Sequence, residues 1–327
     1  MSNTVVHRTT KPLPQTDEDV FGNEQERLEC VYNFRRIDAH GKLYRSARQD
    51  VASEGDLRHL HRLGIRTYLD LRNGIEYRNS LGRKKKTVDG EVRVVEPVLP
   101  DPREKIPYPN LSSVPLKGLD GKPTVLDGSP TATPTRYLID MFPKELILAV
   151  FNTAPLYKRL FSLLLLLLDV ILGNHYKYFV RCFSGEINRL GLVGRYVNIL
   201  EHCGKQLCFV LNTLSNPENL PAVICCAHGK DRTGLVTAMV LSILGKSDEY
   251  IAQEYALSEE GLRPIQKAVR EETSLKYNMD ESFAWAKKNT MLEVLHTLRE
   301  RYGSVEAFLE ASGFTKKNQE KLRQVLS

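Results

Sequence analysis

The chain has 327 residues, of which 42% are hydrophobic and one is Trp, so it can bury an ordinary core without requiring two domains. Its formal net charge of +6 favours an acidic substrate, whereas the absence of a nucleic-acid-binding motif argues against a nucleic acid partner. The spacing of its six cysteines excludes a disulfide framework, and no metal or other cofactor is predicted.

The first 27 residues are predicted to be a flexible lead-in. They are polar and charged, contain Pro12 and Pro14, and lack the apolar core of a signal peptide. Because a reactive thiol later in the chain needs reducing surroundings, we expect a cytoplasmic protein.

From residue 28 onward, short extended segments alternate with helical patterns. The first helix is expected at 55–63, and strands are expected at 41–45, 67–71, 92–95 and 222–225. This alternation predicts an α/β fold with a central, mainly parallel sheet flanked by helices, in which ligands bind at the carboxyl ends of strands. We therefore expect a single domain over residues 28–327.

A basic run, Arg83-Lys84-Lys85-Lys86, precedes the third of these strands. It is interpreted as a solvated hairpin loop, and electrostatic steering of an acidic substrate is the alternative. After that strand the chain passes through Leu99-Pro100-Asp101-Pro102, a sequence typical of a turn.

Residues 110–190 are interpreted as an insertion, a loop followed by apolar helices. The stretch 145–173 culminates in six consecutive leucines. A membrane span needs about 20 uninterrupted apolar residues, and Pro155, Lys158 and Asp169 interrupt this stretch, so a span is not predicted. The alternatives are a helix buried against the core, a hydrophobic lid over the site, and a lid that also touches a bilayer when open.

The most informative segment is Cys225-Cys226-Ala227-His228-Gly229-Lys230-Asp231-Arg232-Thr233-Gly234. It follows an expected strand and leads into the apolar segment 233–244, which predicts a buried helix. A cysteine six positions before an arginine in a glycine-bounded turn is typical of a phosphate-binding loop with a nucleophile at its base. The alternative is an ordinary buried cysteine. A nucleotide-binding P-loop is excluded, because Asp231 stands where Ser or Thr must follow Lys230.

The position of this loop gives its residues chemical roles. The unpaired N–H groups and the dipole of a helix N-terminus stabilise a bound phosphate and favour a Cys226 thiolate. Arg232 offers a planar fork to two phosphoryl oxygens. The Thr233 hydroxyl can donate to the sulfur when a covalent intermediate is hydrolysed. The predicted substrate-binding residues are Ala227, His228, Gly229, Lys230, Thr233 and Gly234.

The loop resembles the His-Cys-x-x-Gly-Lys-Asp-Arg-Thr-Gly signature of an atypical, cysteine-dependent tyrosine phosphatase family of bacteria and fungi. Three further segments are similar to motifs of that family: 33–47 with Asn-Phe-Arg and Tyr-Arg-Ser, 63–76 with Leu-Gly-Ile-Arg-Thr and Asp-Leu-Arg, and 302–309 with Tyr-Gly-Ser. The resemblance covers most of the chain outside 110–190. It implies phosphate-monoester hydrolysis through a cysteinyl phosphate on Cys226, with Arg232 holding the phosphoryl group.

Two loop positions depart from the family. Cys225 stands where the family usually has His, and is interpreted as a buried residue that fills the His pocket. The alternative is a reversible disulfide between Cys226 and Cys225, Cys203 or Cys208, although a bridge between adjacent cysteines is strained. His228 is interpreted as a polar loop residue that faces solvent or substrate, without a catalytic role.

Cleavage of a phosphate ester also needs an acid for the leaving group. Leu99-Pro100-Asp101 resembles the Trp-Pro-Asp acid loop of tyrosine phosphatases with Trp replaced by Leu, which makes Asp101 the first candidate. Asp231 is the second, because it lies in the loop and its pKa would rise beside a phosphate dianion.

These observations together predict a protein-tyrosine phosphatase, with dual specificity left open. A loop with both Lys230 and Asp231 also resembles that of phosphoinositide phosphatases, so a lipid substrate is the alternative. A catalytically inactive phosphate-binding scaffold is the alternative of another class, which the unusual Cys225 keeps open. The predicted partner is accordingly a phosphotyrosine protein or a phosphoinositide.

Overall fold

The computed structural model describes residues 27–81, 92–99, 114–124, 133–174 and 176–327. Asp101, the basic run 83–86 and all but the last residue of the lead-in 1–27 lie outside these ranges. The interpretations of these segments therefore stay predictions.

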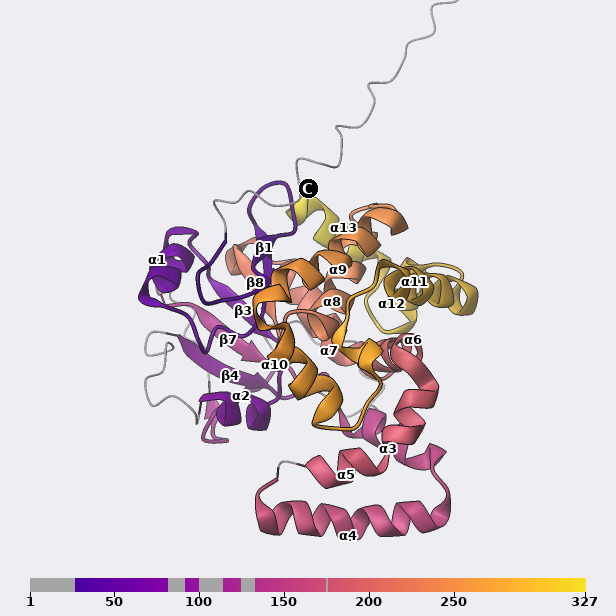
Figure 1. Ribbon diagram of the computed structural model, residues 1–327. Coiled ribbons are helices and arrows are strands. Elements are labelled where there is room, and N and C mark those ends of the chain that lie inside the picture. Colours follow the sequence, from indigo (N-terminus) through magenta and orange to yellow (C-terminus); the bar gives the residue numbers. More distant parts are fainter. Residues whose placement is uncertain (1–26, 82–91, 100–113, 125–132, 175) are drawn as a thin grey trace, which may run out of the picture.

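The described strands form one eight-stranded sheet with the order β1-β2-β8-β3-β7-β4-β5-β6 (Figure 1). Their bounds are β1 Arg35–Arg36, β2 Leu43–Ser46, β3 Thr67–Asp70, β4 Arg93–Pro97, β5 Leu116–Gly118, β6 Pro123–Thr124, β7 Thr135–Leu138 and β8 Ala222–Cys225. The central pairings from β2 through β8, β3 and β7 to β4 are parallel, whereas β1, β5 and β6 pair antiparallel at the edges. The predicted α/β fold with a mainly parallel sheet is confirmed.

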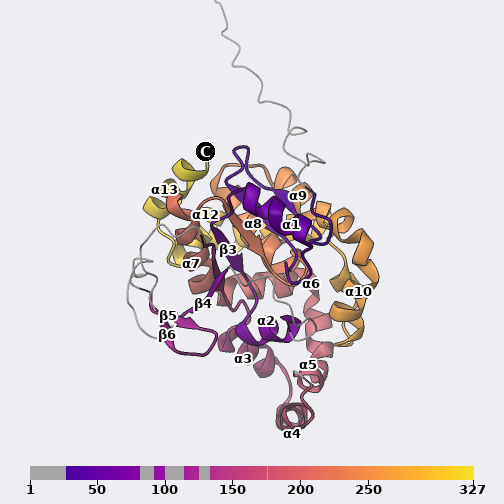
Figure 2. The ribbon, with the colours of Figure 1, turned by 90° about the vertical axis from the view of Figure 1, so that its left-hand side faces the viewer.

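Helices flank this sheet. Their bounds are α1 Glu54–Arg62, α2 Gly74–Leu81, α3 Lys144–Thr153, α4 Leu156–Leu172, α5 Lys177–Cys182, α6 Ser184–His202, α7 Gly204–Leu214, α8 Asp231–Ile243, α9 Asp248–Leu262, α10 Gln266–Arg270, the π-helical turn η6 Glu271–Leu275, α11 Lys288–Tyr302, α12 Val305–Ala311 and α13 Lys316–Leu326. The helices expected at 55–63 and 233–244 are α1 and α8. Figures 1 and 2 show α4 at the end of the molecule opposite the C-terminus.

Helix α8 is the centre of the hydrophobic core. Every residue of α8 after Asp231 is buried. Leu235 and Met239 belong to the same buried cluster as Ile224 of β8 and Leu295 of α11. Because β8 lies between β2 and β3 in the sheet, both ends of the turn from β8 to α8 are anchored in packed structure.

Strand β7 was not predicted. It lies between β3 and β4, inside the segment interpreted as an insertion, so the first part of 110–190 belongs to the central sheet. Arg136, the second residue of β7, is buried and binds Asp70 and Gln49. A charged residue in so short a strand hides the apolar pattern by which a buried strand is recognised.

Helix α4 projects from the body and packs against α5 (Figure 1). Most of its leucine side chains are exposed to solvent, so the alternative of a helix buried against the core is wrong for α4. Of the helices in the described ranges, none combines the length and the apolar character that a membrane span requires.

Candidate active site

The predicted phosphate-binding loop lies between the carboxyl end of β8 and the first turn of α8. Cys226 directly follows β8 and is only 2% exposed, while Asp231 begins the helix. The first N–H groups of α8 have no partner within the helix, and the positive end of the helix dipole lies at the loop. The loop therefore provides the anion-binding environment that the sequence predicts.

The protein body holds the loop through its carbonyl groups. The backbone N–H of Arg48 donates to the Ala227 carbonyl at 3.2 Å. The Gly229 carbonyl accepts hydrogen bonds from the Asn33 amide at 2.9 Å and from the Arg45 guanidinium at 2.6 Å. Because the C=O and N–H groups of neighbouring peptides point in different directions, tying down the carbonyls leaves the amides free for a bound anion.

Gly229 is required by both its backbone conformation and its surroundings. Its φ is +63°, in the left-handed region, and a Cβ there would overlap the backbone of Ser46 at the end of β2. Gly64, after α1, has a similar φ of +66°, but no atom lies within 4 Å of the place that a Cβ would take. A substitution at Gly64 therefore measures the cost of the left-handed backbone without any overlap.

Gly229→Ala is expected to destabilise the protein by at least about 3 kcal/mol, because conformational strain adds to an overlap that neither backbone can relieve. Gly64→Ala is expected to cost only about 1 kcal/mol. Denaturant unfolding of both variants measures the difference. Equal losses of stability would contradict the close approach of the loop to β2.

Arg232 is fixed in one orientation by a carboxylate and a carbonyl. Its two terminal nitrogens each lie 2.7 Å from an oxygen of Glu76, in a bidentate pair, and Nη1 also donates to the Leu71 carbonyl at 2.9 Å. Its guanidinium lies 4.9 Å from the Phe142 ring centroid. Burial lowers the pKa of Arg232, but the Glu76 carboxylate outweighs it and the pKa is raised. The guanidinium is thus charged and preorganised.

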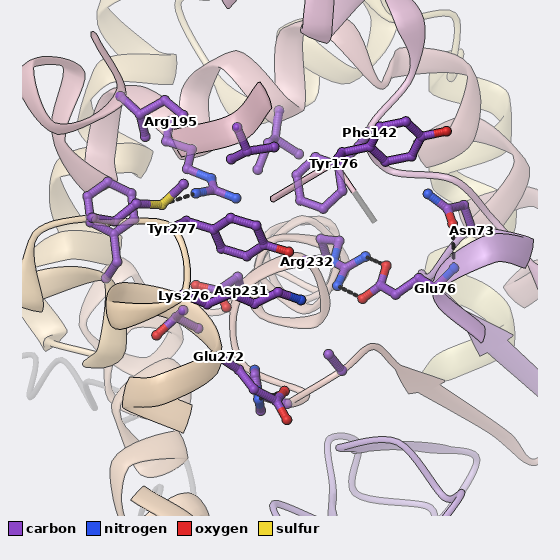
Figure 3. A pocket seen from close by; sticks show the side chains of 18 of the residues that line it. Asn73, Glu76, Phe142, Tyr176, Arg195, Asp231, Arg232, Glu272, Lys276 and Tyr277 are labelled. Atoms are coloured by element: carbon purple, nitrogen blue, oxygen red, sulfur yellow. Dashed lines mark hydrogen bonds and ion pairs between the residues drawn. The ribbon is translucent and has the colours of Figure 1, made fainter. Parts of the chain in front are cut away.

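The loop forms part of the wall of a cavity of about 1270 Å³ (Figure 3). Ala227, His228, Asp231 and Arg232 line it from the loop. The other walls come from α2, α3, α5, α6, η6 and adjoining segments, and include Glu76, Asp140, Arg195, Glu272 and Tyr277. Charged groups are thus gathered near the loop, while α3, α5 and α6 contribute apolar side chains.

Comparison with models of known families identifies the family of this chain. The model of the tyrosine phosphatase family matches residues 31–166 and 182–327. The chain belongs to the tyrosine phosphatase family. It is therefore a phosphomonoesterase, as the four sequence motifs imply, whereas a comparison with curated proteins finds no significant match.

Lys230 of the phosphatase loop is buried and held by three oxygens. Its ammonium donates to the carbonyls of Phe283 at 2.9 Å and Trp285 at 3.1 Å, and it pairs with Asp231 at 2.9 Å. The residue is 1% exposed and does not line the cavity. The contact of Lys230 with substrate stays a prediction, and it would require the ammonium to exchange at least one of these three oxygens for a phosphoryl oxygen.

Asp231 is ionised in the free phosphatase. Burial raises its pKa, but the Lys230 charge, hydrogen bonds from Tyr196 and Lys230, and Arg195 lower it to about 2. The Tyr196 hydroxyl donates to Oδ1 and also meets the Tyr255 hydroxyl at 2.8 Å. The expected rise in pKa thus has to overcome this network, which makes Asp231 a poor proton donor before substrate binds.

His228 connects the loop to η6 across the cavity. Its Nε2 lies 3.0 Å from Glu272, which also pairs with Arg48 at 3.2 Å. The hydrogen bond from His228 is the main cause that lowers the pKa of Glu272 to about 2, with Arg48 adding to it. His228 is buried and lines the cavity, so of the two predicted orientations the solvent-facing one is wrong.

Cys225 fills a polar pocket beneath the loop. It is fully buried, with its sulfur 3.6 Å from Gln49 Oε1 and 3.8 Å from an Arg136 nitrogen. Burial raises its pKa and those of Cys203 and Cys208, so few thiolates are available as resolving nucleophiles. Within the described ranges, no group of three or more His, Cys, Asp or Glu side chains could hold a metal ion.

Thr233 and Gly234 occupy the first turn of α8. The Thr233 hydroxyl is buried and has no hydrogen-bond partner among the described residues, so it is available to the Cys226 sulfur. Gly234 allows α9 to approach closely, since a Cβ there would lie 2.8 Å from the Tyr255 ring. The structure thus gives Gly234 a packing role, and its contact with substrate stays a prediction.

Three residues of the site were not predicted from the sequence to belong to it. Glu76 stands out there only as part of a family motif, although its spacing after Asp-Leu-Arg was the available signal for the Arg232 pair. Asp140 follows the missed strand β7, and burial raises its pKa against an opposing effect of Arg232. Arg195 comes from α6 and makes cation–π contacts with Phe142 and Phe283. No local pattern marks either of the last two.

Proposed function

We propose that the protein is a protein-tyrosine phosphatase in which Cys226 attacks phosphorus and forms a cysteinyl phosphate. Arg232 and the loop amides hold the equatorial oxygens in the ground and transition states. The Thr233 hydroxyl donates to the sulfur as water releases phosphate. The observation that carries this proposal is the placement of Cys226 at the start of a tied-down loop whose Arg232 is aimed into one large cavity.

The proposed acid is Asp101, or Asp140 among the described residues. Asp140 lines the cavity at the carboxyl end of β7, and its raised pKa suits a group that must carry a proton. Asp231 was the second candidate from its position in the loop, but its pKa of about 2 argues for a structural carboxylate that holds Lys230.

Replacing the acid with Asn is expected to slow hydrolysis of phenyl phosphate by about 100-fold or more, and to slow nitrophenyl phosphate much less, because an activated leaving group needs little protonation. We expect this selectivity in Asp101→Asn or Asp140→Asn. Asp231→Asn is expected to affect both esters equally. The hydrolysis rates of the two esters in each variant measure this selectivity. Selectivity found only in Asp231→Asn would overturn the assignment of Asp101 or Asp140 as the acid.

A phosphoinositide is the second candidate substrate, and Arg195 is the observation that favours it. Its guanidinium lines the same cavity as Arg232, and its contacts are with aromatic rings and the Met279 sulfur, at 3.3 Å. A second cation in the cavity suits a second phosphate. Peripheral membrane contact through residues 145–173 belongs to this alternative. A single domain over 28–327 and a reducing, cytoplasmic location complete the proposal.

Release of inorganic phosphate from a phosphotyrosine peptide, a phosphoserine peptide and a phosphoinositide panel tests the function. The reactions contain reductant and a chelator. Turnover of the tyrosine peptide supports the proposal, turnover of the serine peptide as well indicates dual specificity, and turnover of the lipids alone supports the alternative. Binding of a phosphate analogue without any turnover would favour the inactive scaffold.

A further inference from the structure

Helix α4 has its polar residues on the inside and its apolar residues on the outside. The inner face consists of Lys158, Arg159, Ser162, Leu165, Leu166 and Asp169, which are buried or half-buried. The outer face consists of the eleven remaining residues of Leu156–Leu172. Each of them is Leu, Ile, Val, Phe or Tyr, and each is exposed. At 100° per residue the outer face spans about 200° of the helix circumference. This is the reverse of a helix packed on a soluble core.

Polar contacts fix the helix in this orientation. Asp169 accepts hydrogen bonds from the Tyr178 and Phe179 backbone at 3.1 and 2.8 Å, which satisfies the start of α5. Lys158 pairs with Glu186 of α6 at 2.7 Å. Turning the outer face inward would break these contacts and bury charge, so the apolar exposure is built into the fold.

The outer face is too large to be incidental. Its eleven side chains are between 39% and 75% exposed. Their combined area is on the order of 1000 Å², above the roughly 300–600 Å² of the largest apolar patch on a typical monomer. Helix α4, which carries this patch, lies at the end of the molecule, beyond α5 (Figures 1 and 2).

We propose that the outer face of α4 docks on an anionic lipid bilayer. A protein partner, including a second copy, would contact this convex helix on one side only and would leave part of the outer face exposed. It would also have only the Tyr157 hydroxyl as a polar side-chain group for a hydrogen bond. A bilayer covers a wide arc and requires no polar partner. With Lys158 paired to Glu186, helices α4 and α5 keep Arg159, Lys177 and Arg181 against Asp169, a net positive charge that complements anionic headgroups.

Docking places the phosphatase cavity beside the membrane. Leu166 of the inner face lines the cavity, together with Tyr176 and the α5 residues Phe179 and Val180. The family model leaves residues 167–181 unmatched, so the end of α4 and most of α5 lie outside the part shared with the family. A docked protein would present membrane-bound phosphate esters to Cys226. This consequence rests on the proposed function, whereas docking itself does not.

Flotation of the full-length protein with vesicles of phosphatidylcholine, with and without phosphatidylserine, tests the proposal. Wild type is expected to float with both and more strongly with phosphatidylserine. Leu164→Glu is expected to weaken binding about tenfold, because a carboxylate enters the apolar layer. The triple variant Leu160→Glu, Leu164→Glu, Leu167→Glu is expected to abolish it. Leu275→Glu is the matched control, since Leu275 is 59% exposed and Leu164 61%.

Turnover of a soluble aryl phosphate is measured on the same samples. We expect it to be unchanged in Leu164→Glu and in Leu275→Glu, which separates loss of docking from failure of the phosphatase proposal. Absence of wild-type flotation, or equal flotation of the triple variant, would overturn docking. A wild-type dimer that Leu164→Glu dissociates, with no vesicle binding, would assign the face to a second copy instead.

Discussion

Cys226→Ser is expected to reduce phosphotyrosine hydrolysis by at least about 1000-fold, because a serine hydroxyl at this position is not deprotonated by a helix terminus and a nearby arginine. Binding of a phosphate analogue should persist, since Arg232 and the loop amides are untouched. Steady-state phosphate release and analogue titration measure the two properties separately.

The neighbouring thiol provides the control. Cys225 is equally buried, but its sulfur contacts Gln49 and Arg136 beneath the loop. Cys225→Ser is therefore expected to keep activity within about tenfold of wild type, because a small buried hydroxyl replaces a small buried thiol. Loss of activity in Cys225→Ser with full activity in Cys226→Ser would reassign the nucleophile.

Arg232→Lys is expected to lower kcat/KM by about 100- to 1000-fold, although the positive charge is kept. A lysine cannot form the bidentate pair with Glu76 and bind the Leu71 carbonyl at once. It also presents a single donor point to the phosphoryl oxygens. Kinetics on a phosphotyrosine peptide measure the loss.

Arg195→Lys is the comparison for this variant. Arg195 lines the same cavity but lies on α6, outside the loop. We expect a less than about tenfold effect on the phosphotyrosine peptide, since the lost contacts are with aromatic rings rather than with phosphoryl oxygens. Equal effects of the two substitutions would contradict the special role of the Arg232 fork.

The loop and its flanking elements could be predicted because their signals are local. The strand before Cys226, the glycine-bounded turn and the helix after it are all contained in a short, continuous segment. The parallel sheet followed from the alternation of strands and helices. Such features depend little on distant parts of the chain.

The remaining features depend on contacts that cross the chain. Arg136 made β7 unrecognisable, yet it is buried because Asp70 of a neighbouring strand neutralises it. Lys230 turns behind the loop because carbonyls 53 and 55 residues away accept its hydrogen bonds. No periodicity in sequence encodes such pairs.

Helix α4 shows a different limit. Its leucine run favoured a buried helix as strongly as a lid, because hydrophobicity alone does not say what covers an apolar face. Its inward-facing Asp169 and Lys158 decide the orientation, and their partners lie on α5 and α6. The inverted polarity was visible only once those partners were placed.

The proposed mechanism requires that Cys226 carry a phosphoryl group during turnover. Acid quenching of the protein during turnover of a phosphotyrosine peptide, followed by peptide mapping by mass spectrometry, tests it most directly. Thr233→Ala is included because loss of its hydroxyl should slow breakdown and raise the level of the intermediate. We predict a phosphoryl group on Cys226, increased in Thr233→Ala. Continued phosphate release with Cys226 unmodified in both proteins would contradict the mechanism.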